Sequence, residues 1–162
     1  MSVRPAEPDD VEALARIAAA REGQEIAEAR ETIARRLAEA AAGNGLLLVA
    51  VCGGEAVGYG GASLFSPPAD APTGCAPPGW YLSGVVVAPE WRRRGIGDRL
   101  TRERLEWIAR RAGAAFYVAN ARNRASIALH ARLGFAEVTR DFWFPNVAFT
   151  GGEGILFRVE LS

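Results

Sequence analysis

Hydrophobic and polar positions follow two different periods along this chain, and together they predict a mixed α/β fold. Apolar residues recur at helical spacing over residues 11–18, 26–40, 100–112 and 124–133. Apolar or alternating runs typical of strands occupy residues 46–52, 56–63, 80–87, 115–119, 136–144 and 155–161, and Val3–Arg4 predicts a short edge strand. The expected element order is βααβββαβαββ, with a crossover helix between the strands at 80–87 and 115–119.

Turn residues fall between these elements. The Gly43-Asn44-Gly45 run predicts the end of the second helix, and Gly134 is the expected cap of the last one. Gly53-Gly54 predicts a hairpin turn, and the Pro-rich residues 67–79 predict a loop within the domain.

Composition narrows the class of protein. The 162 residues suit one domain spanning 1–162, with 49% hydrophobic and 23% charged residues. The formal net charge is zero, so neither nucleic acid nor a membrane surface is an expected partner. We expect a cytoplasmic protein, because the chain has no long apolar run or signal-like start and its two cysteines form no disulfide framework. The single histidine argues against a metal site.

The most informative segment is Arg92-Arg93-Arg94-Gly95-Ile96-Gly97. It follows a predicted strand and leads into a predicted helix, whose first N–H groups attract anions. Glycine lets a phosphate approach the backbone closely, so the pattern favours a pyrophosphate ligand. A plain basic helix start with solvated arginines is the alternative. Leu100 stands where a dinucleotide fingerprint has its third glycine, and no Lys-Ser/Thr pair of a P-loop follows.

The segment from Val85 to Gly97 resembles the acetyl-CoA motif of the GNAT acetyltransferases, Arg/Gln-x-x-Gly-x-Gly/Ala after a strand. Residues 123–135, NRASIALHARLGF, resemble the second motif of that family, and their wording is nearest to its phosphinothricin-type branch. The two motifs stand in the family's order, so the resemblance implies the GNAT-like acyl-CoA N-acyltransferase fold over nearly the whole chain. It also implies acetyl-CoA as cosubstrate, with no metal.

The resemblance assigns the cofactor site. Backbone groups of the strand would pair with the pantetheine arm, and one N–H would stabilise the oxyanion of the attacked thioester. The turn would hold the pyrophosphate, and the second motif would contact the pantetheine region. The expected cofactor-binding residues are Val85, Val86, Val87, Arg92, Arg93, Arg94, Gly95, Ile96, Gly97, Asp98, Asn123, Ser126 and His130. For Asn123, a helix N-cap is the alternative, and one side chain can serve both roles.

His130 departs from the family pattern, which commonly has tyrosine at this place. The resemblance implies a general acid that protonates the departing CoA thiolate. Histidine titrates at about pH 6.5 when unperturbed, against about 10 for tyrosine, so it donates near neutrality only when charged or in the correct tautomer. A partly buried histidine without chemical role is the alternative.

The base and the acceptor site are predicted less specifically. An alkylammonium must lose a proton before attack. Glu22 is the candidate base and Ser83 a candidate water relay, while Glu25, Tyr81, Asp141 and Trp143 are candidate contacts of the acceptor. Aromatic residues from 141 towards Phe149 would bind an amine by apolar and cation–π contacts. Structural roles, packing or a dimer contact are the alternatives for these positions.

These observations predict an N-acetyltransferase acting on a primary amine of a small molecule by direct attack, with a homodimer carried over from the family. Acetylation of a protein N-terminus or lysine is the alternative enzyme activity. A non-catalytic acyl-CoA sensor is the alternative outside the enzymes.

Overall fold

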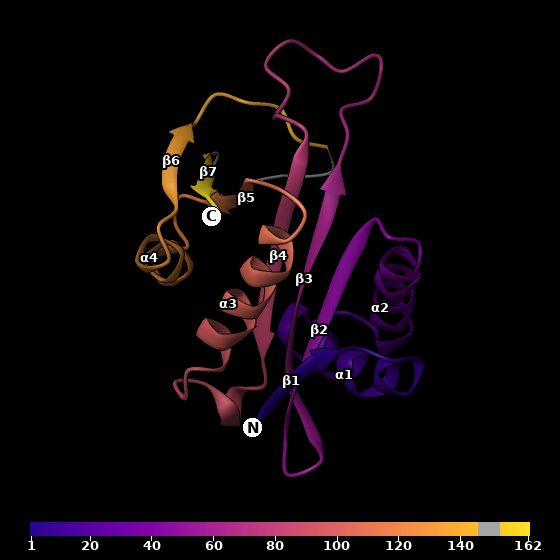
Figure 1. Cartoon of the computed structure of the whole chain (residues 1–162). Helices are drawn as coiled ribbons and strands as arrows, with labels where there is room; N and C mark the ends of the chain where they lie inside the picture. Colours follow the sequence, from indigo (N-terminus) through magenta and orange to yellow (C-terminus); the bar gives the residue numbers. More distant parts are fainter. Residues whose placement is uncertain (146–152) are drawn as a thin grey trace. The chain divides into compact units, whose positions relative to one another are not determined.

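The computed structural model describes residues 1–145 and 153–162 and contains helices and strands in the predicted order. The strands are β1 Ser2–Pro5, β2 Gly45–Cys52, β3 Glu55–Phe65, β4 Gly79–Val87, β5 Ala114–Asn120, β6 Ala136–Thr139 and β7 Gly154–Glu160. The helices are α1 Val11–Glu22, α2 Ile26–Ala41, α3 Ile96–Ala109 and α4 Arg124–Arg132, with short 3-10 turns η1 Pro8–Asp10 and η2 Pro89–Trp91 (Figure 1). The mixed α/β prediction is confirmed.

The strands are hydrogen-bonded in the order β1-β2-β3-β4-β5-β7-β6, which confirms the expected mixed sheet. The pairs β1–β2, β2–β3, β5–β7 and β6–β7 are antiparallel, while β4 and β5, joined through α3, are parallel. The chain divides into two compact units. The first holds residues 1–63 and 83–106, and the second holds 64–82 and 107–162, so β4 contributes to both.

The core of the first unit lies between helices α1 and α2 and the strands beside them. Figure 1 shows α1 and α2 on one side of β2 and β3 and α3 on the other. Leu14 of α1 and Ile33 of α2 pack with Val49 and Tyr59 of the strands. The next residue, Gly60, faces Arg104 of α3, since a Cβ built on Gly60 would lie 3.2 Å from the guanidinium carbon. Tyr59 and Gly60 thus show the two-residue alternation of a strand covered on both faces.

The core of the second unit is aromatic. Tyr81 and Phe116 stack with ring centroids 5.0 Å apart, and Phe65 and Phe144 pack on Tyr81. Gly79 begins β4 at φ 145°, and a Cβ there would lie 2.9 Å from the Phe116 ring. Only glycine therefore lets β4 enter the sheet beside this ring.

One predicted strand is too long. The apolar run from 136 to 144 predicts a single strand, but β6 ends at Thr139. Arg140 there pairs with Glu137 and Glu153, and the Asp141 N–H binds the Thr139 hydroxyl, which turns the chain. The aromatic residues that follow pack in the core of the second unit instead of extending the ladder.

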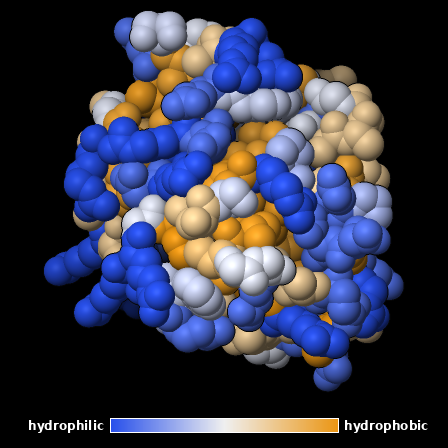
Figure 2. Space-filling model, turned by 60° about the horizontal axis from the view of Figure 1, so that its bottom comes forward, coloured by the Kyte–Doolittle hydropathy of each residue, from blue (hydrophilic) through white to orange (hydrophobic). Residues whose placement is uncertain are grey.

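Hydrophilic side chains cover much of the one face drawn in Figure 2. Figure 2 shows one face, where apolar atoms gather near the centre and polar side chains surround them. The large hydrophobic residues that are exposed within the described chain are Met1, Ile26, Leu64 and Val138. Met1 precedes β1, and the other three lie in α2, β3 and β6.

Candidate functional site

The turn between β4 and α3 has the backbone of an anion-binding loop. Arg93 at φ 62° and Gly95 at φ 78° are both left-handed, and α3 begins immediately afterwards at Ile96. Left-handed residues next to right-handed ones turn successive N–H groups towards one concave side. The sequence predicted this place for the pyrophosphate, but it gave no sign that Arg93 itself adopts the strained conformation.

The arginines of the turn are exposed, and two of them have defined contacts. Arg92 Nε donates to the Val87 carbonyl at 3.1 Å. The guanidinium of Arg94 lies 4.8 Å from the centre of the Trp91 ring. Asp98, in the first turn of α3, accepts a hydrogen bond from Arg102 Nε at 2.7 Å. The turn thus carries a local excess of positive charge in a chain of zero net charge.

Strand β4 extends beyond its pairing with β5. The recorded pairing joins Trp80, Tyr81 and Leu82 to residues 115–117 of β5, and β4 then continues to Val87. The Val86 carbonyl faces β3, because a Cβ on Gly58 of that strand would lie 2.9 Å from it. Strand carbonyls alternate in direction, so those of Val85 and Val87 face the other edge.

Arginine side chains contact this other edge of β4. Arg21 Nη1 donates to the Val85 carbonyl at 3.4 Å, and Arg92 Nε donates to the Val87 carbonyl. Both contacts are exposed. A ligand can displace an exposed arginine side chain from a backbone carbonyl more easily than it can displace a hydrogen-bonded neighbouring strand. The carbonyls of this edge are therefore suited to accept hydrogen bonds from the amide groups of a ligand.

Arg104 is a buried residue next to the candidate site, and the sequence analysis did not single it out. It is 0% exposed in α3, and its Nη1 donates to the carbonyls of Gly61 and Ser83, each at 2.7 Å. Its Nη2 donates to the Thr101 hydroxyl at 2.9 Å, and that hydroxyl donates to the Gly97 carbonyl at 2.8 Å. One buried side chain therefore links β3 and β4 to the first turn of α3, the helix that is expected to bind the pyrophosphate.

A sequence signal for Arg104 existed. It lies four residues after Leu100 and four before Ile108, on the apolar side of the predicted helix. A charged residue within an apolar stripe is rarely buried unless polar partners meet it there. The partners here are backbone carbonyls, which no sequence pattern marks.

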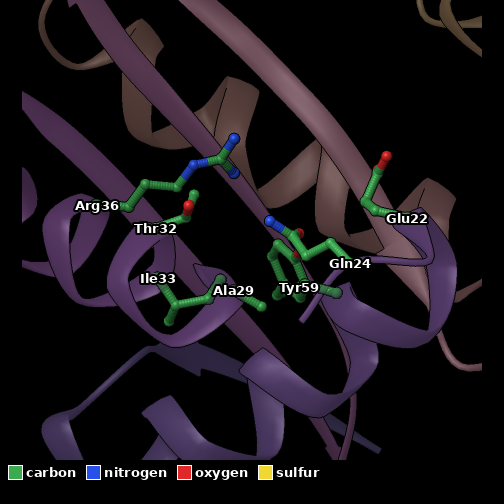
Figure 3. A pocket seen from close by; sticks show the side chains of 8 residues that line it. Glu22, Gln24, Ala29, Thr32, Ile33, Arg36 and Tyr59 are labelled. Atoms are coloured by element: carbon green, nitrogen blue, oxygen red, sulfur yellow. The ribbon is translucent and has the colours of Figure 1, made fainter. Parts of the chain in front are cut away.

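A cavity of about 290 Å³ opens in the first unit near the junction of α1 and α2 (Figure 3). Its lining residues are Ala18, Glu22, Gln24, Ala29, Thr32, Ile33, Arg36 and Tyr59. Glu22, the predicted base, is among them. Glu25 is exposed at the N-cap of α2 and does not belong to this described lining. The sequence therefore located this region but missed Arg36 and Tyr59.

In the second unit, Asn123 is the N-cap of α4. Its side-chain oxygen accepts a hydrogen bond from the Ser126 N–H at 3.3 Å. The Ser126 hydroxyl is in turn hydrogen-bonded to the hydroxyl of Tyr117 on β5. The capping alternative for Asn123 is thus confirmed, and cofactor contact by Asn123 and Ser126 stays a prediction.

His130 is only 3% exposed and is held on three sides. Its Nδ1 lies 2.7 Å from the Ser126 carbonyl, one helical turn earlier. Its ring stacks on Tyr117 and meets Phe135 edge-on at 5.2 Å between centroids. A carbonyl can only accept, so Nδ1 carries the proton, and in the neutral ring Nε2 carries none. A proton donor at Nε2 must therefore be the charged imidazolium.

Two of the predicted residues on β4 have defined structural contacts. The Tyr81 hydroxyl donates to the Pro77 carbonyl at 2.7 Å, and burial raises the pKa of Tyr81 well above its usual value. Ser83 gives its carbonyl to Arg104, and its Oγ lies where a Cβ on Gly61 would come within 2.9 Å. Acceptor contact by Tyr81 and a water relay at Ser83 stay predictions.

The predicted aromatic acceptor contacts lie in the second unit. Trp143 forms an isolated β-bridge with Cys75, and its carbonyl accepts from the Ala76 N–H at 2.8 Å. Asp141 is exposed beside Thr139. The continuation of this aromatic stretch through Phe149 falls in 146–152, outside the described residues. The role of Asp141 and Trp143 towards an acceptor stays a prediction.

Within residues 1–145 and 153–162, no group of three or more histidine, cysteine or acidic side chains is placed to hold a metal ion. Helices of this described part are also too short or too polar to cross a membrane.

The fold and the two motif regions define the class of this protein. The family model described as Acetyltransferase (GNAT) family matches residues 11–135, so the chain belongs to the GNAT acetyltransferases. A ribosomal-protein-alanine N-acetyltransferase from Brucella melitensis has the same fold, with a TM-score of 0.75 and 24% identity over 99% of this chain and 100% of that one. A phosphinothricin acetyltransferase from Sinorhizobium meliloti, solved with acetyl-CoA, has a TM-score of 0.71 and 20% identity, over 99% of this chain and 88% of that one.

A sequence relative is an aminoglycoside N(6')-acetyltransferase type 1 from Acinetobacter genomosp. 13. The two sequences are 36% identical over 68 residues, which is 41% of this chain. The match spans 46% of that relative, less than half of its length.

Proposed function

We propose that this chain transfers an acetyl group from acetyl-CoA to a primary amine of a small molecule. The observation that carries the proposal is the edge of β4 between Leu82 and the anion-binding turn. It offers the carbonyls of Val85 and Val87 in a row, and left-handed Arg93 and Gly95 follow directly. An acyl-CoA carries amides along its pantetheine arm and a pyrophosphate beyond it. These groups stand in the same order as the strand carbonyls and the turn that would bind them.

The reaction is direct attack. The neutral amine nitrogen forms a bond to the thioester carbon, the C–S bond breaks, and the CoA thiolate leaves and takes up a proton. A strand N–H near Val86 would stabilise the oxyanion, and Glu22 or water would accept the proton of the ammonium group. Cys52 lies in β2 and has no histidine near it in the sequence to activate its thiol, so a cysteine acyl-enzyme is not expected.

The size of the cavity favours a small acceptor. At about 290 Å³ it lies at the lower end of ligand pockets, which span roughly 300–1,000 Å³. The aminoglycoside and phosphinothricin relatives act, by their names, on small molecules, whereas the Brucella melitensis neighbour acts on a ribosomal protein. We propose a small-molecule acceptor for this chain as well. We also expect it to work as a homodimer in the cytoplasm, as predicted from the sequence.

The experiment measures CoA release with acetyl-CoA and two panels, one of small primary amines and one of peptides with free N-termini or lysines. Isothermal titration with acetyl-CoA accompanies it. We expect micromolar binding and turnover on small amines. Turnover on peptides alone would support the protein acetyltransferase alternative. Binding without turnover on either panel would support the sensor.

A further inference from the structure

The cavity near the junction of α1 and α2 is apolar at its base and charged at two opposite sides. Ala18, Ala29 and Ile33 belong to its lining, and all three are buried members of the core. Figure 3 shows Arg36 and Glu22 on opposite sides of the cavity. Gln24 and Tyr59 lie between them (Figure 3). The cavity thus separates a positive group from a negative one across a polar middle.

Arg36 is positioned for an anion from outside the chain. It is half-buried, and within residues 1–145 and 153–162 no ion pair or hydrogen bond is recorded for its side chain. Arg30, earlier on α2, shows the contrast: its Nε lies 2.8 Å from the Glu12 carboxylate. A guanidinium at a cavity wall gains most from a carboxylate that binds its planar fork with two hydrogen bonds.

Tyr59 adds a neutral donor beside Arg36. The residue is 5% exposed, and burial raises the pKa of its phenol, so the hydroxyl keeps its proton at neutral pH. The positive charge of Arg36 lowers that pKa and the negative charge of Glu22 raises it. Arg21 also lowers this pKa. Tyr59, Arg36 and Glu22 all line the same cavity, so the three groups surround one space.

We propose that the acceptor is a small amino carboxylate, such as an amino acid, whose carboxylate binds Arg36 and the Tyr59 hydroxyl. Its ammonium group lies towards Glu22, where it loses its proton before attack. This inference rests on the proposed acetyltransferase function. It disfavours polycationic acceptors, because Arg36 repels added positive charge and the cavity holds little more than an amino acid with its side chain.

Matched acceptors test the carboxylate. The standard amino acids are compared with their carboxamides, which keep the amine and side chain but lose the negative charge, in the CoA-release assay. We expect the best amino acid to exceed its carboxamide in kcat/KM by about 10-fold to 100-fold, the range of one charge-assisted hydrogen-bonded contact. Binding of the same ligands to the protein loaded with CoA is measured by isothermal titration.

Variants of α2 identify the binding group. Arg36→Met should raise the KM of the preferred amino acid about 10-fold to 100-fold and leave its carboxamide and acetyl-CoA unaffected. Arg36→Lys should recover part of the loss, because it restores the charge without the planar fork. Arg35→Met is the matched control: Arg35 is the preceding, exposed residue outside the described lining and should leave every KM unchanged.

The outcomes separate this inference from the function on which it rests. Equal turnover of acids and carboxamides, unchanged in Arg36→Met, overturns the carboxylate site while the acetyltransferase stands. Binding that depends on the carboxylate and Arg36, without turnover on any amine, supports the site and contradicts the acetyltransferase. Failure of every amino acid to bind or react overturns the inference.

Discussion

The imidazole of His130 lies flat on the phenol ring of Tyr117, with centroids 3.7 Å apart and planes 2° from parallel. The two residues also meet through Ser126, whose carbonyl binds the histidine and whose hydroxyl binds the tyrosine. The orientation of the His130 ring and its tautomer are thus fixed together. The family resemblance predicts an acid at His130, and this arrangement requires that acid to be charged.

The first prediction concerns His130→Phe. Phenylalanine keeps the stack on Tyr117 but has no ring nitrogen, so an acid role predicts a kcat loss of about 10²-fold or more. The wild-type kcat should also fall as pH rises and the imidazolium loses its proton, and the variant should lack this fall. A pH series of steady-state kcat values, with acetyl-CoA saturating, measures both effects.

The control is Tyr117→Phe, which removes the hydroxyl at Ser126 and keeps the stack. It should lower stability by about 0.5–1.5 kcal/mol, the contribution of one hydrogen bond, without removing the pH dependence. An unchanged kcat in His130→Phe at every pH would show that the histidine is structural.

A second prediction concerns the anion-binding turn. Gly95→Ala places a Cβ at φ 78°, which costs about 1–2 kcal/mol, and brings it next to the expected phosphate. We expect the KM of acetyl-CoA to rise 10-fold or more, with kcat at saturation nearly unchanged. Gly53→Ala, at φ 57° in the β2–β3 turn, has the same backbone strain far along the chain from the turn. It should reduce thermal stability and leave that KM unchanged, and equal KM effects in both variants would exclude a local role.

A third prediction concerns Arg104. Arg104→Met leaves the carbonyls of Gly61 and Ser83 without this donor in a buried place, and we expect a loss of about 2–4 kcal/mol in urea unfolding. Ser83 precedes the part of β4 that is proposed to bind the pantetheine arm, so the affinity for acetyl-CoA should also fall. Isothermal titration below the unfolding transition measures this affinity. Arg110→Met changes an exposed arginine just after α3 and should stay within about 0.5 kcal/mol of wild type. Unchanged affinity in a folded Arg104→Met protein would limit this residue to stability.

The fourth prediction is a pH dependence of stability. The Asp10 carboxylate accepts hydrogen bonds from Arg4 Nη1 and Nη2 at 2.8 and 3.0 Å, and Arg4 chiefly holds its pKa below the usual value. In the unfolded chain the pKa of an aspartate is about 4. Because the pKa of Asp10 is lower in the folded protein, its carboxylate stabilises the fold fully at pH values above the unfolded pKa. This contribution disappears as the pH falls through the folded pKa. Asp10→Asn should therefore lose about 1–3 kcal/mol at pH 7 and approach wild type at low pH.

Urea unfolding of both proteins between pH 7 and about pH 3 measures this convergence. The neighbouring, exposed Asp9 provides the control, since Asp9→Asn changes the same formal charge without the Arg4 pair. A constant difference between Asp10→Asn and wild type over the whole range would contradict the linkage.

Local signals predicted well where the physics is local. Asn123 stands before the helical pattern of α4 and caps it, and Gly134 follows the same helix at φ 94°. The prediction of one strand over residues 136–144 was wrong because apolar residues are equally suited to a strand and to a packed loop. Arg140 and the aromatic residues around Tyr81 decided between the two.

The sequence by itself determined the element order and the family, and it predicted where an anion-binding turn would lie, because each depends on the spacing of residues near one another in the chain. Only the tertiary structure decided that Arg104 reaches β3 and β4 and that Arg36 and Tyr59 share a cavity with Glu22. These groupings bring together residues at least fourteen positions apart in the sequence, and a pattern along the chain does not specify distances between such residues.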